Sequence, residues 1–170
     1  MKQGKILILN GVSSSGKSTL SRVLQDRSPK PLYRLDIDDF ILMAPDKFND
    51  YEKGDFSVQY AFASKFFHAV KLYSDLGFDL VVPYMFFKDS ETLREFRTLL
   101  ADYSVLVVNM HCPAKELRRR ELSRQNRSVG SAEAQLGLLE RDFEGSITAD
   151  NYHSTNEACA DEILRHFLSM

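Results

Sequence analysis

Eight consecutive residues near the start of the chain are of the types that hold a phosphate group. They read Gly11-Val12-Ser13-Ser14-Ser15-Gly16-Lys17-Ser18, which is the complete Walker A pattern. Its two glycines permit backbone angles that turn successive N–H groups inward around one anion. Lys17 is placed to reach the β- and γ-phosphates as a point charge, and the Ser18 hydroxyl is placed to ligate Mg²⁺. This stretch therefore predicts a site for the phosphates of ATP.

The residues on either side give this motif the context that it needs. The apolar run 6–10 before it predicts a buried strand, and residues 18–26 after it predict a helix. The N-terminal end of that helix would add unpaired N–H groups and the positive end of the helix dipole. A chance match in a turn rich in serine and glycine would lack this strand and helix. The predicted nucleotide ligands are Gly11, Ser13, Ser14, Ser15, Gly16, Lys17, Ser18, Thr19 and Arg120.

Carboxylates follow a second apolar run, residues 32–37, which predicts a second strand. The chain reads Asp36-Ile37-Asp38-Asp39 there, and ligands of parallel sheets bind at the carboxyl ends of the strands. Asp36 and Asp38 would share one side of an extended backbone. One of them could hold Mg²⁺ while the other accepts the proton of an attacking hydroxyl. The alternative is that Asp38 or Asp39 caps a helix starting at Phe40.

Basic residues are concentrated between positions 115 and 127. Arg120, Arg124 and Arg127 are spaced i, i+4 and i+7, so they would share one face of a helix. Arginines at the rim of a phosphate site can neutralise a transferring phosphoryl group and exclude water as the site closes. Arg118 and Arg119 fit better on a solvated basic face paired with Glu116 and Glu121. We therefore predict a lid over approximately residues 120–135.

Length and composition fit one globular domain over residues 1–170. Hydrophobic residues make up 44% of the chain, charged residues 27%, and the net charge is -2, so no broad basic field points to nucleic acid. No apolar stretch approaches the roughly 20 residues of a membrane span. The first residues run directly into the first strand and leave no room for a signal peptide. Cys112 and Cys159 are expected to be free, buried thiols, and the expected location is the cytoplasm.

Strand and helix patterns alternate along the chain, which indicates βαβ units and a parallel sheet. The fold class expected is a three-layer α/β/α P-loop NTPase with a five-stranded parallel sheet and a small helical lid. Further strands are expected at 78–82, 103–110 and about 145–149, and further helices at 56–76, 90–101, 113–127 and 154–168. The irregular segment 45–55 is expected to be a loop or short helix near the active site.

Several of these segments resemble chloramphenicol phosphotransferase, a small P-loop kinase of the nucleoside-monophosphate-kinase-like fold. The resemblance rests on Ile8-Leu9-Asn10-Gly11 with the serines, glycine and lysine that follow, then on Ile37-Asp38-Asp39-Phe40-Ile41 and Met43-Ala44-Pro45. In that family the aspartate matching Asp38 is taken as the base that deprotonates the acceptor hydroxyl. The resemblance thus implies Asp38 as the base and leaves Asp36 as the metal candidate. The carboxylate pair also resembles that of gluconate and shikimate kinases.

The resemblance continues more sparsely, and it includes one departure. Residues 120–127 are similar to the arginine-bearing lid of the family, and residues 150–154 to its closing strand-to-helix turn. Where the family has acidic residues after its third strand, this chain has Pro83-Tyr84-Met85-Phe86, followed by Phe87. The acceptor pocket is therefore expected to be more aromatic and apolar, with metal support left to Ser18, Asp36 and water.

The expected activity is transfer of the γ-phosphoryl group of ATP, with Mg²⁺, to a hydroxyl of a small-molecule acceptor. Asp38, Lys17, Arg120 and Arg124 are the expected catalytic residues, and Ser18 and Asp36 the expected metal ligands. An antibiotic such as chloramphenicol is the narrower expectation for the acceptor. The alternatives are a nucleotide or sugar-acid kinase, a nucleotide-binding regulatory ATPase, and an inactive kinase relative that binds nucleotide only. No Asn-Lys-x-Asp run of GTPases occurs.

Overall fold

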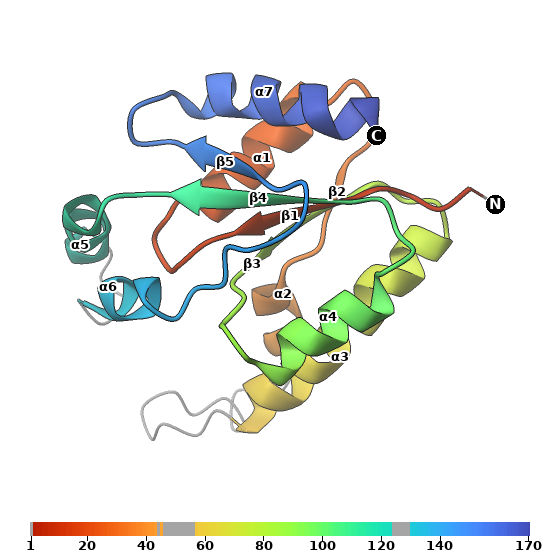
Figure 1. Cartoon of the computed structure of the whole chain (residues 1–170), viewed down its shortest axis with the longest axis horizontal. Coiled ribbons are helices and arrows are strands. Elements are labelled where there is room, and N and C mark those ends of the chain that lie inside the picture. The colour runs from red at the N-terminus through yellow and green to blue at the C-terminus, as the bar shows by residue number, and fades with distance from the viewer. Residues whose placement is uncertain (1, 44, 46–56, 124–129) are drawn as a thin grey trace.

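Five parallel strands form one sheet in the order β2-β3-β1-β4-β5 in the computed structural model (Figure 1). The structure describes residues 2–43, 45, 57–123 and 130–170. The first strand lies at the centre, with Ile8 opposite Val82 on one side and opposite Val107 on the other. The strands are β1 Ile6–Asn10, β2 Tyr33–Arg34, β3 Leu80–Tyr84, β4 Val105–His111 and β5 Ile147–Asp150.

Helices cover both faces of this sheet, which confirms the expected three-layer fold. In Figure 1, α1 (Lys17–Arg27) and α7 (Asn156–Ser169) lie on one face, and α3 (Ser57–Asp75) and α4 (Glu91–Leu99) lie on the other. Beyond the arrowheads of β1 and β4 lie α5 and α6. The bounds of the remaining helices are Ile37–Ile41 for α2, Ala114–Leu122 for α5 and Ser131–Leu136 for α6.

The central strand separates two apolar cores. Leu7 and Leu9 pack with side chains of α1 and α7, whereas Ile6 and Ile8 pack with side chains of α3 and α4. All four are fully buried because both faces of the sheet are covered. A strand buried on both faces needs apolar residues at every position, and this explains the continuous apolar run in the sequence.

The second strand is shorter than expected. It ends at Arg34, and a helix begins at Ile37 instead of continuing the strand. Asp36 accepts a hydrogen bond from the Asp38 backbone N–H at 3.2 Å and so caps this helix. The expectation that Asp36 and Asp38 share one side of an extended backbone is therefore wrong, and so is a helix start at Phe40. The N-cap preference of aspartate prevails over the apolar run.

The third strand begins and ends two residues later than expected and contains a proline. The backbone N–H of Leu80 points toward β1, where it donates to Lys5 O. Because this direction alternates from residue to residue along a strand, the backbone nitrogen of Pro83 points toward β2. Pairing with β2 stops at Val81, so the missing N–H of Pro83 removes no ladder hydrogen bond. A proline is thereby tolerated inside a strand of a parallel sheet.

Several smaller expectations are confirmed. Ser90 caps α4 by accepting a hydrogen bond from Leu93 N–H, and Thr155 caps α7 in the same way. Cys112 and Cys159 are free and buried.

Among the described residues, no helix is both long and apolar enough to cross a membrane. Arg124, Arg127 and most of the segment 45–55 lie outside the residues that the structure describes.

Candidate functional site

The phosphate-binding loop connects the central strand to α1, and its shape depends on close backbone packing. A Cβ atom at Gly11 would lie 2.7 Å from Ser15 Oγ and 2.8 Å from Met110 Cβ, so only glycine fits there. Gly16 has φ of 98° and forms the N-cap of α1 without any side-chain cap. The first N–H groups of α1 are thus not bonded by a capping side chain. A helix N-terminus without a side-chain cap is the kind of anion-binding end that the sequence predicts here.

Lys17 folds back over the start of the loop. Its ammonium donates to the carbonyl oxygens of Gly11 at 2.7 Å and Val12 at 2.8 Å. The same lysine lines a cleft of about 170 Å³ at the carboxyl edge of the sheet. The cleft also contains both candidate carboxylates, so the structure brings the predicted phosphate and acceptor residues together. Its lining comprises Ser13, Ser14, Gly16, Lys17, Ser18, Asp36, Ile37, Asp38, Pro83, Tyr84, Met85 and Gln135.

Asp36 is a buried carboxylate at the floor of this cleft, 8% exposed. Burial raises the pKa of Asp36 above its ordinary value, opposed in part by the hydrogen bond from Asp38 N–H. The Arg34 guanidinium lies 3.6 Å from its Oδ2 atom and opposes the rise less strongly. Asp36, and neither Asp38 nor Asp39, is therefore the helix cap, which leaves the Asp38 side chain in the first turn of α2.

The donor set around the cleft fits Mg²⁺ with water completing the shell. Ser18 is exposed at the first turn of α1, and it lines the same cleft as Asp36 and Asp38. Within the described ranges, no three His, Cys, Asp or Glu side chains form a metal-binding group. Mg²⁺ commonly binds through one or two carboxylates, substrate phosphates and several waters, so a full protein cage is unnecessary.

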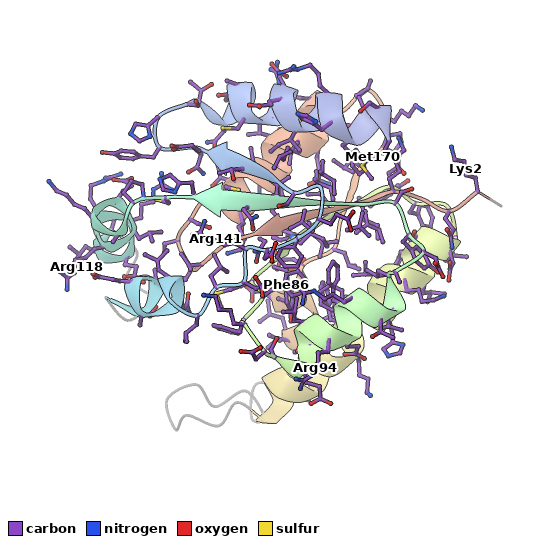
Figure 2. All side chains as sticks on the ribbon, in the orientation of Figure 1. Lys2, Phe86, Arg94, Arg118, Arg141 and Met170 are labelled. Carbon is purple, nitrogen blue, oxygen red and sulfur yellow. The ribbon has the colours of Figure 1, made fainter. Side chains whose placement is uncertain are left out.

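Of the predicted arginines, Arg120 reaches the phosphate loop. Its Nε donates to Glu116 at 2.7 Å, and its Nη1 lies 3.4 Å from the carbonyl oxygen of Ser14. Arg119 shares the same glutamate, and the two guanidinium groups lower the pKa of Glu116 to about 2. Arg118 points away from the body of the protein in Figure 2, as expected for a solvated face.

A second hollow of about 140 Å³ opens on the outer side of the loop. It contains the predicted ligands Arg120 and Thr19 but also Asn151, which the sequence analysis did not single out. Asn151 Nδ2 donates to Ser15 O at 3.0 Å and lies where a Cβ on Gly16 would be. The signal available in the sequence was the turn 150–154, whose residues were noted only for their resemblance. The hollow is lined by Ser14, Gly16, Thr19, Arg120, Asn151 and Asn156.

The expected aromatic acceptor wall is only partly present. Tyr84 and Met85 line the cleft, but Phe86 is fully buried among Phe67, Phe96 and Phe143 in the α4 core (Figure 2). Phe86 is therefore a core residue, and its expected place in the acceptor pocket is wrong. Burial raises the pKa of Tyr84 to about 12, so its phenol stays protonated at neutral pH.

A buried glutamate joins α5 and α6, which overlap the predicted lid 120–135. Glu121 of α5 accepts hydrogen bonds from the backbone N–H groups of Gly130 and Ala132, both at 2.8 Å, and from Ser131 Oγ at 3.1 Å. Burial by itself would raise the pKa of Glu121, but these hydrogen bonds outweigh it and lower the pKa. The sequence analysis assigned Glu121 to the solvated basic face, and this assignment is wrong because Glu121 is 1% exposed.

Comparisons with known proteins find relatives and solved structures that cover most of this chain. A Mycobacterium tuberculosis protein, named provisionally as an O-phosphotransferase, is 28% identical over 180 aligned positions, covering 90% of this chain and 79% of the relative. A sugar kinase from Janibacter sp. HTCC2649 has a TM-score of 0.72 at 19% identity, covering 98% of this chain and 95% of its own. The APS kinase of Mycobacterium tuberculosis, in complex with AMPPNP and APS, has a TM-score of 0.70 at 16% identity, with both chains fully covered.

A protein-family model matches this chain as well. The model of the chloramphenicol phosphotransferase-like proteins matches residues 4–168, which is nearly the whole chain. The match spans the phosphate loop, the carboxylates after β2 and the lid region, so it includes every part of the cleft described above. The chain therefore belongs to the chloramphenicol phosphotransferase-like family, among the small-molecule kinases of the P-loop fold.

Proposed function

We propose that this protein transfers the γ-phosphoryl group of ATP to a hydroxyl of a small molecule. The observation that carries the proposal is that Lys17 of the phosphate loop and Asp38 of α2 line the same cleft. A phosphoryl-transfer site needs a cradle for the donor beside a base for the acceptor, and both are present within one volume of about 170 Å³. The nucleotide-bound APS kinase of the same fold supports ATP as the donor.

In the proposed reaction the acceptor oxygen forms a bond to the γ-phosphorus. The bond between that phosphorus and the β–γ bridging oxygen breaks, and its electron pair leaves with ADP. Asp38 accepts the hydroxyl proton. Lys17, the loop N–H groups and Arg120 offset the charge on the phosphates, and sequence spacing assigns Arg124 to the same task. Mg²⁺ held by Ser18 and Asp36 would supply further charge neutralisation when bound.

The charges of the cleft favour an acceptor without an anionic group. Among the described lining residues, Lys17 is the only cation, whereas Asp36 and Asp38 bring two carboxylates. A sugar acid or a nucleoside monophosphate would place its own anion beside them. Pro83 and Met85 add apolar surface to the same wall. These features support a neutral or cationic hydroxylated compound with an apolar part, and chloramphenicol is a compound of that kind.

Transfer from ATP to a panel of hydroxylated acceptors tests the proposal. The panel should contain chloramphenicol and other neutral or cationic antibiotics, neutral sugars, gluconate, shikimate and nucleoside monophosphates. Wild type should phosphorylate a neutral or cationic member, with product identified by mass spectrometry, whereas Lys17→Ala and Asp38→Asn should not. The proposal fails if no acceptor stimulates ATP turnover, or if Asp38→Asn keeps full transfer activity.

The same panel separates a kinase from a regulatory ATPase. A regulatory ATPase would hydrolyse ATP slowly without any acceptor, and Asp38→Asn would leave that rate unchanged. An inactive relative would bind ATP with no turnover at all. Measuring ATP affinity by calorimetry, with and without Mg²⁺, therefore distinguishes binding from catalysis.

A further inference from the structure

A glutamine of the lid region lies directly on the phosphate loop. Gln135 belongs to α6, and its Oε1 accepts a hydrogen bond from the Ser13 backbone N–H at 2.9 Å. The same side chain lines the cleft that contains Lys17, Asp36 and Asp38. Gln135 is thus a neutral amide placed among the charged groups of the proposed transfer site.

The position of Ser13 identifies the part of the nucleotide that Gln135 would meet. Lysine of this loop reaches the β- and γ-phosphates, and here its ammonium lies against the carbonyls of Gly11 and Val12. The beginning of the loop is therefore its γ-phosphate end, and the N-terminus of α1 is the end nearer the other phosphates. Ser13 follows Val12 directly, so its partner Gln135 lies at the γ-phosphate end.

Gln135 is held firmly in this position at both ends of its helix. At the N-terminal end, Glu121 accepts hydrogen bonds from three groups between Gly130 and Ala132. At the C-terminal end, Leu138 O accepts from Lys88 N–H at 2.9 Å, and Glu140 N–H donates to Phe86 O at 2.8 Å. A short helix fixed in this way presents its side chain at one defined place on the loop.

The hydrogen bond from Ser13 also fixes which way the carboxamide of Gln135 faces. Its oxygen is engaged by a backbone N–H, so the Nε2 group, with two N–H donors, forms the other end of the amide. We infer that Gln135 is a further residue of the transfer site, which donates a hydrogen bond from Nε2 to an oxygen of the γ-phosphoryl group. This inference rests on the proposed function, and it assigns to α6 a direct contact with the group being transferred.

The decisive variant is Gln135→Glu, because it changes only the donor end of the side chain. A glutamate still accepts a hydrogen bond from Ser13 N–H, so the loop keeps its support, but it offers no N–H and adds a negative charge. Gln135→Met keeps the length and removes both functions. Ala134→Glu is the matched control, since it adds the same charge at an exposed position of the same helix.

Affinities for ATP and ADP should be measured by calorimetry, together with kcat, KM and thermal unfolding. A hydrogen bond to a charged group corresponds to roughly a 10- to 100-fold change in binding. We expect Gln135→Glu to weaken ATP by that factor and ADP by less than about 3-fold, with an unchanged unfolding temperature. Gln135→Met should weaken ATP selectively as well but also lower the unfolding temperature, and Ala134→Glu should match wild type.

Two results would overturn the inference. One is wild-type affinity for both ATP and ADP in both Gln135→Glu and Gln135→Met. The other is an equal loss for both nucleotides, because that pattern belongs to a residue that only shapes the loop. If wild type phosphorylates no acceptor, the proposed function fails, while the ATP-to-ADP ratio still decides the role of Gln135. If wild type transfers phosphate and the ratio is unchanged, only the inference about Gln135 fails.

Discussion

The proposed donor and acceptor sides of the cleft are built in opposite ways. On the donor side, consecutive residues from Gly11 to Ser18 provide backbone N–H groups and one ammonium. On the acceptor side, α2 contributes Asp38, and the end of β3 contributes Tyr84. One side is a local piece of backbone, and the other is assembled by tertiary packing. A local motif can be recognised in a sequence. The residues of an assembled wall cannot, because they depend on which side chains are buried in the core instead.

The largest effect should come from Asp38→Asn, which removes the base of the acceptor side and leaves the donor side untouched. General-base catalysis contributes about 10²–10⁴ to rate, so kcat should fall by that factor while ATP affinity stays unchanged. Steady-state kinetics and calorimetry measure the two quantities separately. Lys17→Ala should instead weaken both ATP binding and turnover.

Asp39→Asn is the control for this comparison. Asp39 is the neighbouring carboxylate of α2, it pairs with Arg34 at 3.1 Å, and it is exposed. Its replacement should leave kcat within about 2-fold of wild type, since exposed ion pairs stabilise by less than about 1 kcal/mol. Equal losses in the two variants would mean that the helix needs negative charge in general and that Asp38 is no specific base.

A smaller effect, on stability, should follow from Phe86→Ala. Phe86 is fully buried and packs with Phe96 at a ring-centroid distance of 4.5 Å, so its loss leaves a cavity. Truncation of a buried phenylalanine lowers the free energy of unfolding by about 3–5 kcal/mol. Chemical denaturation measures this change, and Phe87→Ala, 37% exposed in the wild type, should change it far less. If Phe86→Ala keeps its stability but changes its acceptor preference, Phe86 contacts the acceptor and is not only a core residue.

Three glycine variants compare Gly16 of the phosphate loop with Gly130 and Gly137, which flank α6. Gly16→Ala should lower stability by more than the roughly 1–2 kcal/mol of the left-handed conformation, because the new Cβ also meets Asn151 Nδ2. Gly130 has φ of 93° with open space around it, so Gly130→Ala isolates the conformational part. Gly137 has φ of -70°, so Gly137→Ala should raise the free energy of unfolding by about 0.4–1 kcal/mol. Thermal unfolding of all three checks this order, and ATP affinity should fall only for Gly16→Ala.

The smallest effect concerns Asp36, which the two sides share. Its pKa is raised in the folded protein, so the stabilisation from its bound proton is complete below the unfolded pKa and is lost as the pH rises through the folded pKa. Asp36→Asn should therefore gain stability relative to wild type as the pH rises from the ordinary aspartate pKa of 3.8 to neutral, since asparagine caps a helix as well as aspartate does.

Unfolding free energies of wild type and Asp36→Asn across that pH range measure the difference. A constant difference at every pH would show that Asp36 titrates alike in the folded and unfolded chains. The same variant should need more Mg²⁺ for ATP binding if Asp36 also supports the metal. An unchanged Mg²⁺ requirement would limit Asp36 to its role as a helix cap.

Most of the fold could be predicted from the sequence because its signals are local. The apolar run before the loop gave β1 with its correct bounds, and Ser90 marked the start of α4 correctly. The sequence predicted a five-stranded parallel sheet but not the order of its strands, which only the structure shows. In the site, Lys17, Asp38 and Arg120 lie at or beside the loop, as expected.

What could not be predicted depended on competition between neighbouring signals or on distant contacts. The apolar residues around Asp36 suggested a strand, but its capping hydrogen bond begins a helix instead. From the sequence, Phe86 could line the pocket, but in the fold it packs against Phe96 of α4. Gln135 and Asn151 reach the loop from 122 and 136 positions away, and no spacing rule connects residues so far apart.

The central place of β1 has a consequence for the order in which the protein is made. Asn10, at the end of β1, donates to Asn109 in a hydrogen bond that spans 99 positions, and its oxygen accepts from Phe86 N–H across 76. A ribosome produces β1 long before either partner strand, and pairings of such long range form slowly. Until then the four apolar residues of β1, Ile6 to Leu9, have no cover, which makes them a natural binding segment for a chaperone. The phosphate loop is thus synthesised well before the strands that complete its support.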